Sequence, residues 1–369
     1  MIEKEVIIVG AGPAGLAAAI EAAKAGASVL VVDLNLKAGG QLFKQIHKFF
    51  GSSAHRSGVR GFDIGTQLLD EARHYGVEIW LNSAAVGIYD GKVVSIEKGL
   101  ENGEKILINV HAEKIILTTG AQENVVRFKG WTLPGIMGAG AAQTMINVHK
   151  VKPGKKVVML GSGNVGLIVS YQLLQAGCEV AGLVEALPNI GGYGVHAAKI
   201  SRAGIPIYTK HTIIEARGIT RVSEVTIAEI DDKFQPIPGT EKIIEADVVA
   251  LAAGLKPVSD LVRLAELELA FNGPLGGWIP LHNRNMESTK PGIFVAGDTT
   301  GVEEANTALE EGRLAGTAAA EALGYLSEKD AKVIKDDIWN RLDGLRMGPF
   351  GVKRMAAKTE LLKNFPQYN

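Results

Sequence analysis

The sequence predicts an α/β protein with two Rossmann-like dinucleotide-binding domains, the second inserted into the first, and a small antiparallel sheet in each. Two observations lead to this prediction. A strand, a glycine-rich loop, a helix and a second strand occur in that order twice, over residues 6–33 and 157–185. After each copy come alternating polar and apolar residues and then a buried apolar run that ends in glycine, at Gly120 and Gly254.

The first copy reads VIIVGAGPAGLAAAIEAAKAGASVLVVD. Its apolar, β-branched start predicts a buried parallel strand, and the alanine-rich stretch predicts a helix that ends at Gly26. A second strand then ends in Asp33. Between the first strand and the helix lies the pattern G-x-G-x-x-G, with an acid about 20 residues later, which is the context that dinucleotide binding requires.

Each glycine of this pattern has its own physical role. The first makes the turn, the second lets a pyrophosphate approach the backbone, and the third lets helix and strand pack closely. The helix N-terminus offers N–H groups to the phosphates, and the acid accepts hydrogen bonds from ribose hydroxyls. The alternative is a tight turn that binds nothing. We predict a cofactor site at Gly10, Gly12, Pro13, Ala14, Gly15 and Asp33.

The second copy, VVMLGSGNVGLIVSYQLLQAGCEVAGLVE, repeats this layout with one inserted residue. Its helix is expected to end at Gly177 and its second strand at Glu185. A glycine pair follows each copy, at Gly39-Gly40 and at Gly191-Gly192. We predict a second nucleotide site at Gly161, Gly163, Asn164, Val165, Gly166, Glu185 and Gly254.

Charge and cysteine content argue against a nucleic-acid-binding protein, a membrane protein and a protein with a dithiol or iron–sulfur site. The formal net charge of −1 over 369 residues gives no indication of nucleic-acid binding. Glu21 and Lys24 interrupt the first apolar stretch, so we expect a cytoplasmic protein without a membrane span. The single cysteine, Cys178, excludes a CxxC dithiol and a cysteine-ligated iron–sulfur cluster built from this chain alone. No metal site and no catalytic side chain is assigned.

The segment PGIFVAGDTTGVEEANTALEEGRLAGTAAAEAL, residues 291–323, resembles the second FAD fingerprint of the two-dinucleotide-binding-domain flavoproteins, which include glutathione and thioredoxin reductases. The motifs run in that family's order from residue 6 to residue 323. The resemblance implies that Asp298 binds the flavin's ribityl chain and that a helix beginning near Glu304 points at the pyrimidine end of the ring. It also makes TTGA (118–121) a crossover strand and GGQL (39–42) a flavin-lining loop. The flavin-binding residues that it adds are Gly39, Gly40, Gln41, Thr119, Gly120, Gly297, Asp298, Glu304 and Ala305.

This resemblance implies FAD in the first loop, NAD(H) in the second, and hydride transfer between nicotinamide and flavin. It divides the chain into an FAD-binding domain in two parts (1–122 and 256–326), an NAD(H)-binding domain (123–255) and a helical C-terminal extension (327–369). Glu185 would repel a 2′-phosphate and accept a hydrogen bond from a free 2′-hydroxyl, and no arginine follows it, which favours NADH over NADPH.

Disulfide reductases of this fold need two reactive cysteines, and Cys178 has no partner. The segment from Thr118 to Gly166, which contains GWTLPG, resembles the FAD-containing A-type subunits of opine oxidases, dye-linked proline dehydrogenases, heterotetrameric sarcosine oxidase and hydrogen cyanide synthase. That resemblance implies a second flavoprotein subunit that oxidises an amino acid, an amine or a 2-hydroxy acid. The tail after Leu323 has no cysteine, so an iron–sulfur subunit would have to be another chain.

Two segments keep open alternatives. The tail predicts one or two amphipathic helices whose apolar stripe either packs on its own domain or meets a partner; the stripe is Val333, Ile334, Ile338, Leu342 and Leu345. The segment QLFKQIHKFFGSSAHRSGVRG is either a basic wall for a carboxylate substrate or acidic partner, with a histidine as proton donor, or a solvated loop; its basic residues are Lys44, His47, Lys48, His55, Arg56 and Arg60.

The functional prediction is an FAD-dependent, NAD(H)-linked oxidoreductase subunit of a heteromeric amino-acid, amine or 2-hydroxy-acid dehydrogenase. One alternative is a stand-alone NADH:acceptor oxidoreductase that reduces an electron-transfer protein or a quinone. The other is a subunit whose second nucleotide is structural only.

Overall fold

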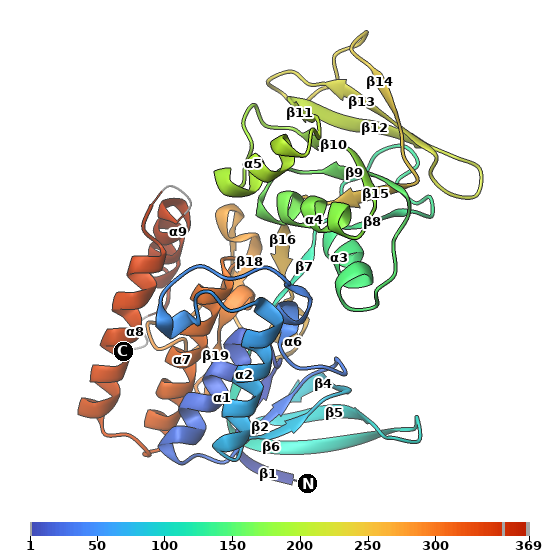
Figure 1. The fold of residues 1–369 in the computed structure, drawn as a ribbon. Coiled ribbons are helices and arrows are strands. Elements are labelled where there is room, and N and C mark those ends of the chain that lie inside the picture. Colours follow the sequence, from blue (N-terminus) through green and yellow to red (C-terminus); the bar gives the residue numbers. More distant parts are fainter. Residues whose placement is uncertain (1, 349–350, 367–369) are drawn as a thin grey trace. The chain divides into compact units, whose positions relative to one another are not determined.

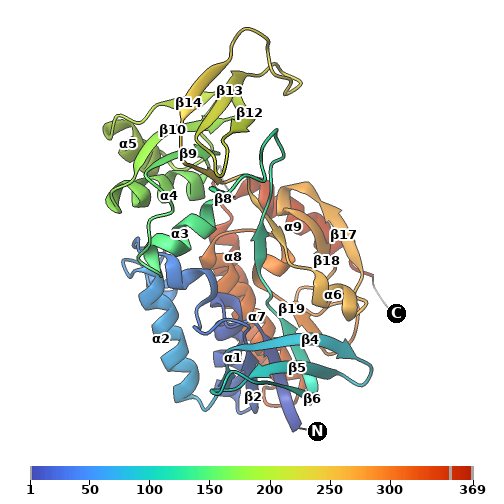
Figure 2. The same cartoon turned by 90° about the vertical axis from the view of Figure 1, so that its right-hand side faces the viewer.

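The computed structural model describes residues 2–348 and 351–366. The chain forms two compact units, and the second is inserted into the first. Unit 1 comprises residues 1–122 and 256–369, and unit 2 comprises residues 123–255. The chain passes from one unit to the other in β7 (Ala121–Glu123) and returns in β16 (Leu255–Pro257). Figures 1 and 2 show the elements of each unit.

Unit 1 is built on one sheet in the order β3-β2-β1-β6-β5-β4, with β19 also paired to β6. Strand β6 is long enough to pair with two neighbouring strands in opposite orientations. Its C-terminal part pairs in parallel with β1, and its N-terminal part pairs antiparallel with β5. The strands are β1 (Ile2–Val9), β2 (Val29–Val32), β3 (Glu78–Trp80), β4 (Ser83–Tyr89), β5 (Val93–Gly99), β6 (Lys105–Leu117) and β19 (Ile293–Val295). The antiparallel strands expected after the first copy are therefore continuous with the parallel sheet.

Helices cover one face of this sheet. Successive residues of β1 point to opposite faces, so Ile8 packs beneath the helices while Ile7 joins the core on the other side. The helices on the first face are α1 (Pro13–Ala25), α2 (Gly61–His74), α7 (Ala305–Ala322) and α8 (Glu328–Leu345); α6 (Asp260–Leu264) packs on the second. Helices α1 and α7 lie side by side (Figure 1). They pack at backbone distance, because a Cβ on Gly312 would lie 2.1 Å from the Ala14 carbonyl oxygen.

The C-terminal helices belong to unit 1. Ile338 and Leu342 of α8 are buried in the core shared with α1 and α7, while Val333 is 66% exposed. Helix α9 (Val352–Lys363) packs through Ala357 and Leu361 on the hairpin of β17 (Leu269–Asn272) and β18 (Gly277–Pro280). The predicted stripe thus packs mainly on its own unit. The short helices of this unit are η1 (Gly40–Lys44), η2 (Ser53–His55), η3 (Gly273–Leu275) and η4 (Gly297–Thr300).

Unit 2 contains a parallel sheet in the order β11-β10-β9-β15-β8 and a separate antiparallel sheet, β12-β13-β14. Helices α3 (Ala139–Asn147), α4 (Asn164–Gln175) and α5 (Gly194–Arg202) pack on one face of the parallel sheet, and the antiparallel sheet packs on the other. The parallel strands are β8 (Ile136–Gly138), β9 (Lys156–Leu160), β10 (Glu179–Glu185), β11 (Ile207–Thr209) and β15 (Val248–Leu251). The antiparallel strands are β12 (His211–Arg217), β13 (Glu224–Glu229) and β14 (Lys242–Glu245).

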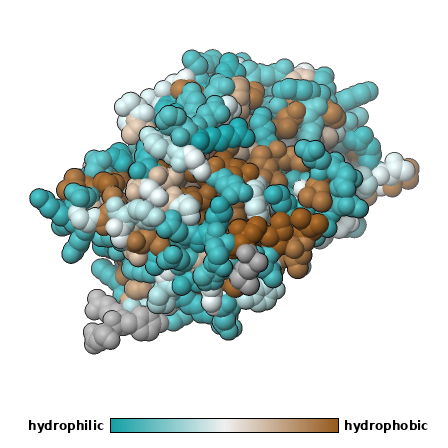
Figure 3. All heavy atoms as spheres, turned by 90° about the horizontal axis from the view of Figure 1, so that it is seen from below, coloured by the Kyte–Doolittle hydropathy of each residue, from teal (hydrophilic) through white to brown (hydrophobic). Residues whose placement is uncertain are grey.

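Hydrophobic residues are concentrated in these cores. In the view of Figure 3 most of the surface is hydrophilic, and brown hydrophobic side chains reach it in limited patches. Among the residues that the structure describes, no helix combines the length and apolar character needed to cross a membrane.

Candidate dinucleotide sites

The first glycine loop is closed by backbone atoms at its first and third glycines, Gly10 and Gly15, and open at its second, Gly12. Gly10 has φ +111°, and a Cβ there would lie 2.4 Å from the Thr118 carbonyl oxygen. A Cβ on Gly15 would lie 1.8 Å from the Gly10 carbonyl oxygen, so only glycine fits between β1 and α1. At Gly12 the nearest atom to a Cβ is the Gly40 Cα, at 3.8 Å. Space beside Gly12 is therefore free for a ligand to approach the backbone.

The start of α1 is available to an anion. Gly12 is its N-cap and has no side chain to accept from the first-turn N–H groups, and Pro13 follows directly. The N–H groups of Ala14 and Gly15 belong to this first turn, where the helix itself contains no carbonyl groups that could accept hydrogen bonds from them. This end of α1 therefore has the donors that a pyrophosphate uses.

Asp33 is held at the edge of the first loop. Its Oδ2 accepts from the Ala11 N–H at 2.7 Å, and its Oδ1 accepts from the Asn35 N–H at 2.8 Å. The side chain is only 7% exposed. A carboxylate oxygen has room for a further hydrogen bond, so Asp33 retains the capacity to accept from a hydroxyl group.

The second loop repeats this geometry. A Cβ on Gly166 would lie 2.1 Å from the Gly161 carbonyl oxygen, whereas a Cβ on Gly163 would meet nothing within 4 Å. Glu185 Oε2 accepts from the Ser162 N–H at 2.8 Å, and Oε1 accepts from the Leu187 N–H at 2.9 Å. These bonds correspond to those of Asp33, so the two sequence copies fold into the same loop structure.

The glycine pairs lie against these loops. The Gly39 N–H donates to the Ala11 carbonyl at 2.8 Å, and the Gly192 N–H donates to the Ser162 carbonyl at 2.9 Å. Gly40, in the left-handed region at φ +52°, lies close enough to Gly12 that a Cβ would be 2.8 Å from the Gly12 Cα.

The remaining predicted residues of the second site differ in their surroundings. Asn164 Oδ1 accepts from the Tyr193 N–H at 2.8 Å and so ties the loop to the start of α5. Val165 is 41% exposed. Gly254 has φ +85°, and its carbonyl accepts from the Asn124 N–H at 3.0 Å. Gln41, in the first site, lies exposed in η1.

Residues distant in sequence meet at the turn before α7. The Gly120 N–H donates to Thr299 Oγ1 at 3.0 Å, and Thr119 Oγ1 lies 3.2 Å from the same oxygen. Gly297, at φ +71°, packs on α1, because a Cβ there would lie 2.8 Å from the Ala14 Cβ. The crossover strand, the first loop and the Gly297-Asp298 motif therefore form one continuous wall of unit 1.

Asp298 has a carboxyl group with hydrogen-bonding capacity to spare. Its Oδ1 accepts a long hydrogen bond, 3.4 Å, from the Glu303 N–H. Burial raises the pKa of this half-buried carboxyl to about 7, since a site removed from water disfavours the charged form. Glu304 is the N-cap of α7 and Ala305 its first residue, so this helix begins where the sequence predicted. A hydroxyl donor beside Asp298 would satisfy the carboxyl.

In the basic segment that begins at Gln41, His55 and Arg56 are bound to acidic side chains of unit 1. His55 is 3% exposed, and its Nε2 lies 2.8 Å from Glu310 Oε1. Arg56 pairs with Glu71 at 2.5 Å, and His47 stacks on Phe49 at a centroid distance of 5.0 Å. At least His55 and Arg56 therefore serve to hold the segment on unit 1.

Sequence reasoning missed a group of buried charges on α7 and the C-terminal helices. Glu310 and Glu311 are 0% and 3% exposed, and their partners include Arg341, Arg346 and Lys358. Two adjacent acids inside the alanine-rich helix were the available signal, but their partners lie 31 to 47 residues away in the chain.

Comparison with known proteins identifies a family and several proteins to which this chain is similar. Residues 4–312 match the model of the pyridine nucleotide-disulphide oxidoreductase family. Hydrogen cyanide synthase subunit HcnB of Pseudomonas aeruginosa is 29% identical over 95% of this chain and 78% of its own length. The A-type subunit of opine oxidase from Agrobacterium tumefaciens is 29% identical over 88% of this chain, which spans 66% of that protein. The resemblance to A-type oxidase subunits is thus confirmed.

Solved structures share the fold. Thioredoxin reductase of T. acidophilum superposes with a TM-score of 0.70 and 24% identity, covering 88% of this chain and 99% of that one. L-Proline dehydrogenase of P. horikoshii superposes with a TM-score of 0.68 and 21% identity, covering 92% of this chain and 59% of that one. The predicted fold class, Rossmann-like sheets with antiparallel additions, is confirmed.

Proposed function

The chain belongs to the pyridine nucleotide-disulphide oxidoreductase family, whose members are flavin-dependent oxidoreductases, and we propose that it binds FAD in the first loop and NAD(H) in the second. The observation that carries the proposal is the repeated loop geometry. In each loop the second glycine borders open space, the third is closed by backbone, and a buried acid is fixed at the loop edge. These are the features that a dinucleotide requires.

Several predicted residues of unit 1 have a defined role in this proposal. The first turn of α1 binds the pyrophosphate beside Gly12, and Asp33 accepts from the adenosine ribose. Asp298 accepts from or donates to the ribityl hydroxyls, and the N-terminus of α7 favours negative charge at the pyrimidine end of the ring. When bound, the flavin exchanges a hydride with a reduced or oxidised nicotinamide. The residues of this chain bind and orient, and no acid–base side chain is assigned to that step.

We propose NADH rather than NADPH as the partner of the second loop. Glu185 is 8% exposed and already accepts from Ser162 and Leu187, so its carboxylate is held in place. A fixed negative charge at this position repels a 2′-phosphate and accepts from a free 2′-hydroxyl. The discrimination therefore rests on a charge that cannot move away from the ligand.

The chain is not proposed to reduce disulfides. Cys178 is its only cysteine, it is 4% exposed, and burial raises the pKa of its thiol. A thiol that stays protonated is a poor nucleophile, and a second thiol to form an internal disulfide is missing from the sequence. Substrate oxidation is assigned instead to a partner flavoprotein that oxidises an amino acid, an amine or a 2-hydroxy acid. The support for this is that HcnB and the opine oxidase relative are both subunits of larger enzymes by name.

An anaerobic titration tests the proposal. The chain is reconstituted with FAD, and the visible absorption of the flavin is followed while NADH or NADPH is added. We expect rapid bleaching by NADH, and we expect the preference for NADH over NADPH to fall by about tenfold in Glu185→Gln, which keeps the shape but removes the charge. Glu179→Gln, an exposed position on the same strand, is the control and keeps the preference. A bound flavin that stays oxidised with both nucleotides would contradict hydride transfer and leave a structural nucleotide in the second loop.

A further inference from the structure

The two carboxylate oxygens of Glu311, in α7, bind different partners. Its Oε2 accepts from the Gly297 N–H at 3.1 Å and from Thr300 Oγ1 at 2.7 Å, both in the turn that carries Asp298. Its Oε1 accepts from Arg346 Nη2 at 2.6 Å and from Lys358 Nζ at 2.7 Å. One buried carboxylate thus joins the turn beside the proposed flavin site to two cations of the C-terminal extension.

The two cations are buried as deeply as the carboxylate. Arg346, just after α8, is 3% exposed and also pairs with Glu303 at 2.6 Å. Lys358, in α9, is 3% exposed and also donates to Thr300 Oγ1 at 2.8 Å. Lys358 therefore touches the turn directly and, through Glu311, a second time.

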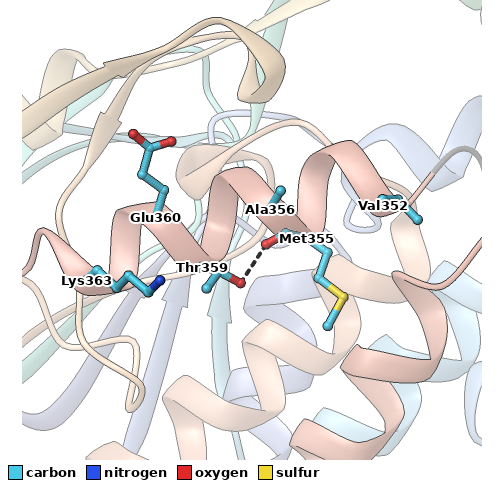
Figure 4. A pocket seen from close by; sticks show the side chains of 6 residues that line it. All are labelled: Val352, Met355, Ala356, Thr359, Glu360 and Lys363. Atoms are coloured by element: carbon cyan, nitrogen blue, oxygen red, sulfur yellow. Dashed lines mark hydrogen bonds between the residues drawn. The ribbon is translucent and has the colours of Figure 1, made fainter.

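Buried apolar side chains pack both of these helices on unit 1. Ile338 and Leu342 hold α8, and Ala357 and Leu361 hold α9. On α9, Val352, Met355, Ala356, Thr359, Glu360 and Lys363 line a separate open hollow (Figure 4). Buried ion pairs are weak contributors to stability, because desolvation offsets much of their attraction. The buried charges are therefore better explained by what they hold in place.

Electrostatics supports the same view. Burial by itself would raise the pKa of the Glu311 carboxyl, but Lys358 and Arg346 hold it below its usual range. Without one cation, the carboxylate would be left with uncompensated charge next to the Gly297 N–H. It would then take up a proton or draw in water, and the turn would lose its fixed acceptor.

We propose that the C-terminal extension clamps the flavin-binding turn, with Lys358 acting through Glu311 and Thr300 as a positioning residue for Asp298. The inference rests on the proposed function, because it takes the Gly297-Asp298 turn to be a flavin contact. The extension thereby becomes part of the flavin site, because Lys358 contacts the turn at Thr300 and Glu311 links Lys358 and Arg346 to it. Loss of the clamp weakens FAD binding and leaves the nucleotide loop of unit 2 unaffected.

Lys358→Met tests the clamp, since methionine keeps most of the length and removes the charge. FAD affinity is measured by titrating flavin-free protein and following flavin fluorescence, and NADH affinity is measured in the same preparation by calorimetry. We expect the Kd for FAD to rise by about tenfold or more, with the Kd for NADH unchanged. Lys353→Met, an exposed lysine on the same helix, is the matched control and keeps the wild-type Kd for FAD. In the double variant Glu311→Gln/Lys358→Met both charges are absent, and the loss is expected to be smaller than in Lys358→Met alone.

A measurement on the wild-type chain avoids any variant that fails to fold. Coupling is reciprocal, so FAD that depends on the clamp must also stabilise it. Adding FAD to the flavin-free chain should slow amide hydrogen exchange in residues 352–363 by about fivefold or more, and exchange in the outer strands of unit 2 should stay the same. Unchanged exchange in α9 on FAD binding, or wild-type FAD affinity in a folded Lys358→Met chain, overturns the clamp. A wild-type chain that binds no FAD would instead overturn the proposed function.

Discussion

The difference between Gly12 and Gly15 gives a direct test of whether the first loop exists to bind a ligand. Both belong to the same pattern, but only Gly15 is enclosed by the protein's own backbone. Gly12 has φ −77° and ψ −174°, a conformation open to any residue, and a Cβ there would have 3.8 Å to its nearest neighbour. Gly12→Ala therefore adds one methyl group to the space that we assign to the pyrophosphate.

The effect on folding should be small. Alanine is a poorer N-cap than glycine by up to about 1 kcal/mol, but it also restricts the unfolded chain, which offsets about 0.4–1 kcal/mol. The melting temperature of the flavin-free chain should therefore move by no more than about 3 °C. The effect on binding should be large. A phosphate pushed away from the first turn of α1 loses one or two charge-assisted hydrogen bonds of about 1.5–3 kcal/mol each, which raises the Kd for FAD by about 10- to 100-fold or more.

The assay is a fluorescence titration of flavin-free protein with FAD, beside a thermal melt of the same sample. Gly163→Ala is the matched control, because it adds the same methyl group to the second loop, where a Cβ would meet nothing within 4 Å. It should leave FAD binding unchanged and weaken NADH binding. Wild-type FAD affinity in a folded Gly12→Ala chain would refute the assignment of the first loop as the flavin pyrophosphate site.

Three further outcomes follow from the same contacts. Gly166→Ala would place a Cβ 2.1 Å from the Gly161 carbonyl oxygen, so it should destabilise unit 2 by about 1–3 kcal/mol, measured as a lower denaturant midpoint. The raised pKa of Asp298, about 7, means that the folded chain holds this proton more tightly than the unfolded chain, so stability falls as pH rises from about 4 to 7. In the flavin-free chain, the free energy of unfolding of Asp298→Asn, taken relative to that of the wild type, should therefore rise by about 1–2 kcal/mol between pH 5 and pH 8, after allowance for solvent screening. Urea unfolding at the two pH values measures this difference, and an unchanged difference would contradict the sign. Ile338→Ala in α8 should cost about 2–5 kcal/mol because this side chain is 1% exposed, and a loss below about 1 kcal/mol would show that α8 does not pack on unit 1.

Local patterns were sufficient to locate both glycine loops. A strand, turn and helix that are contiguous in sequence must fold next to one another, so glycine spacing reports directly on backbone contacts. The helix predicted to end at Gly26 does so in the left-handed conformation, and the antiparallel strands predicted after the first copy include β4 and β5. The helix predicted to begin near Glu304 is α7, which begins at Ala305. Each of these features depends on residues within one or two turns of each other.

Long-range partners were beyond the reach of sequence patterns. His55 reads as a loop cation, yet it is buried against Glu310, 255 residues away in the chain. Glu311 reads as a surface acid in a helix, yet Lys358 and Arg346 meet it inside unit 1. A charged side chain gives no sign in the sequence of whether its partner is water or an ion of opposite charge.

The sequence by itself determined the elements whose physics is local: two glycine-rich turns, the helices that follow them, and an acid at the end of each second strand. Only the tertiary structure decided how the buried charges pair, because burial of an ion depends on which distant helix covers it. That is why the two loops could be read in order along the chain, while the connection between the C-terminal extension and the Gly297-Asp298 turn appears only when α7, α8 and α9 are packed together.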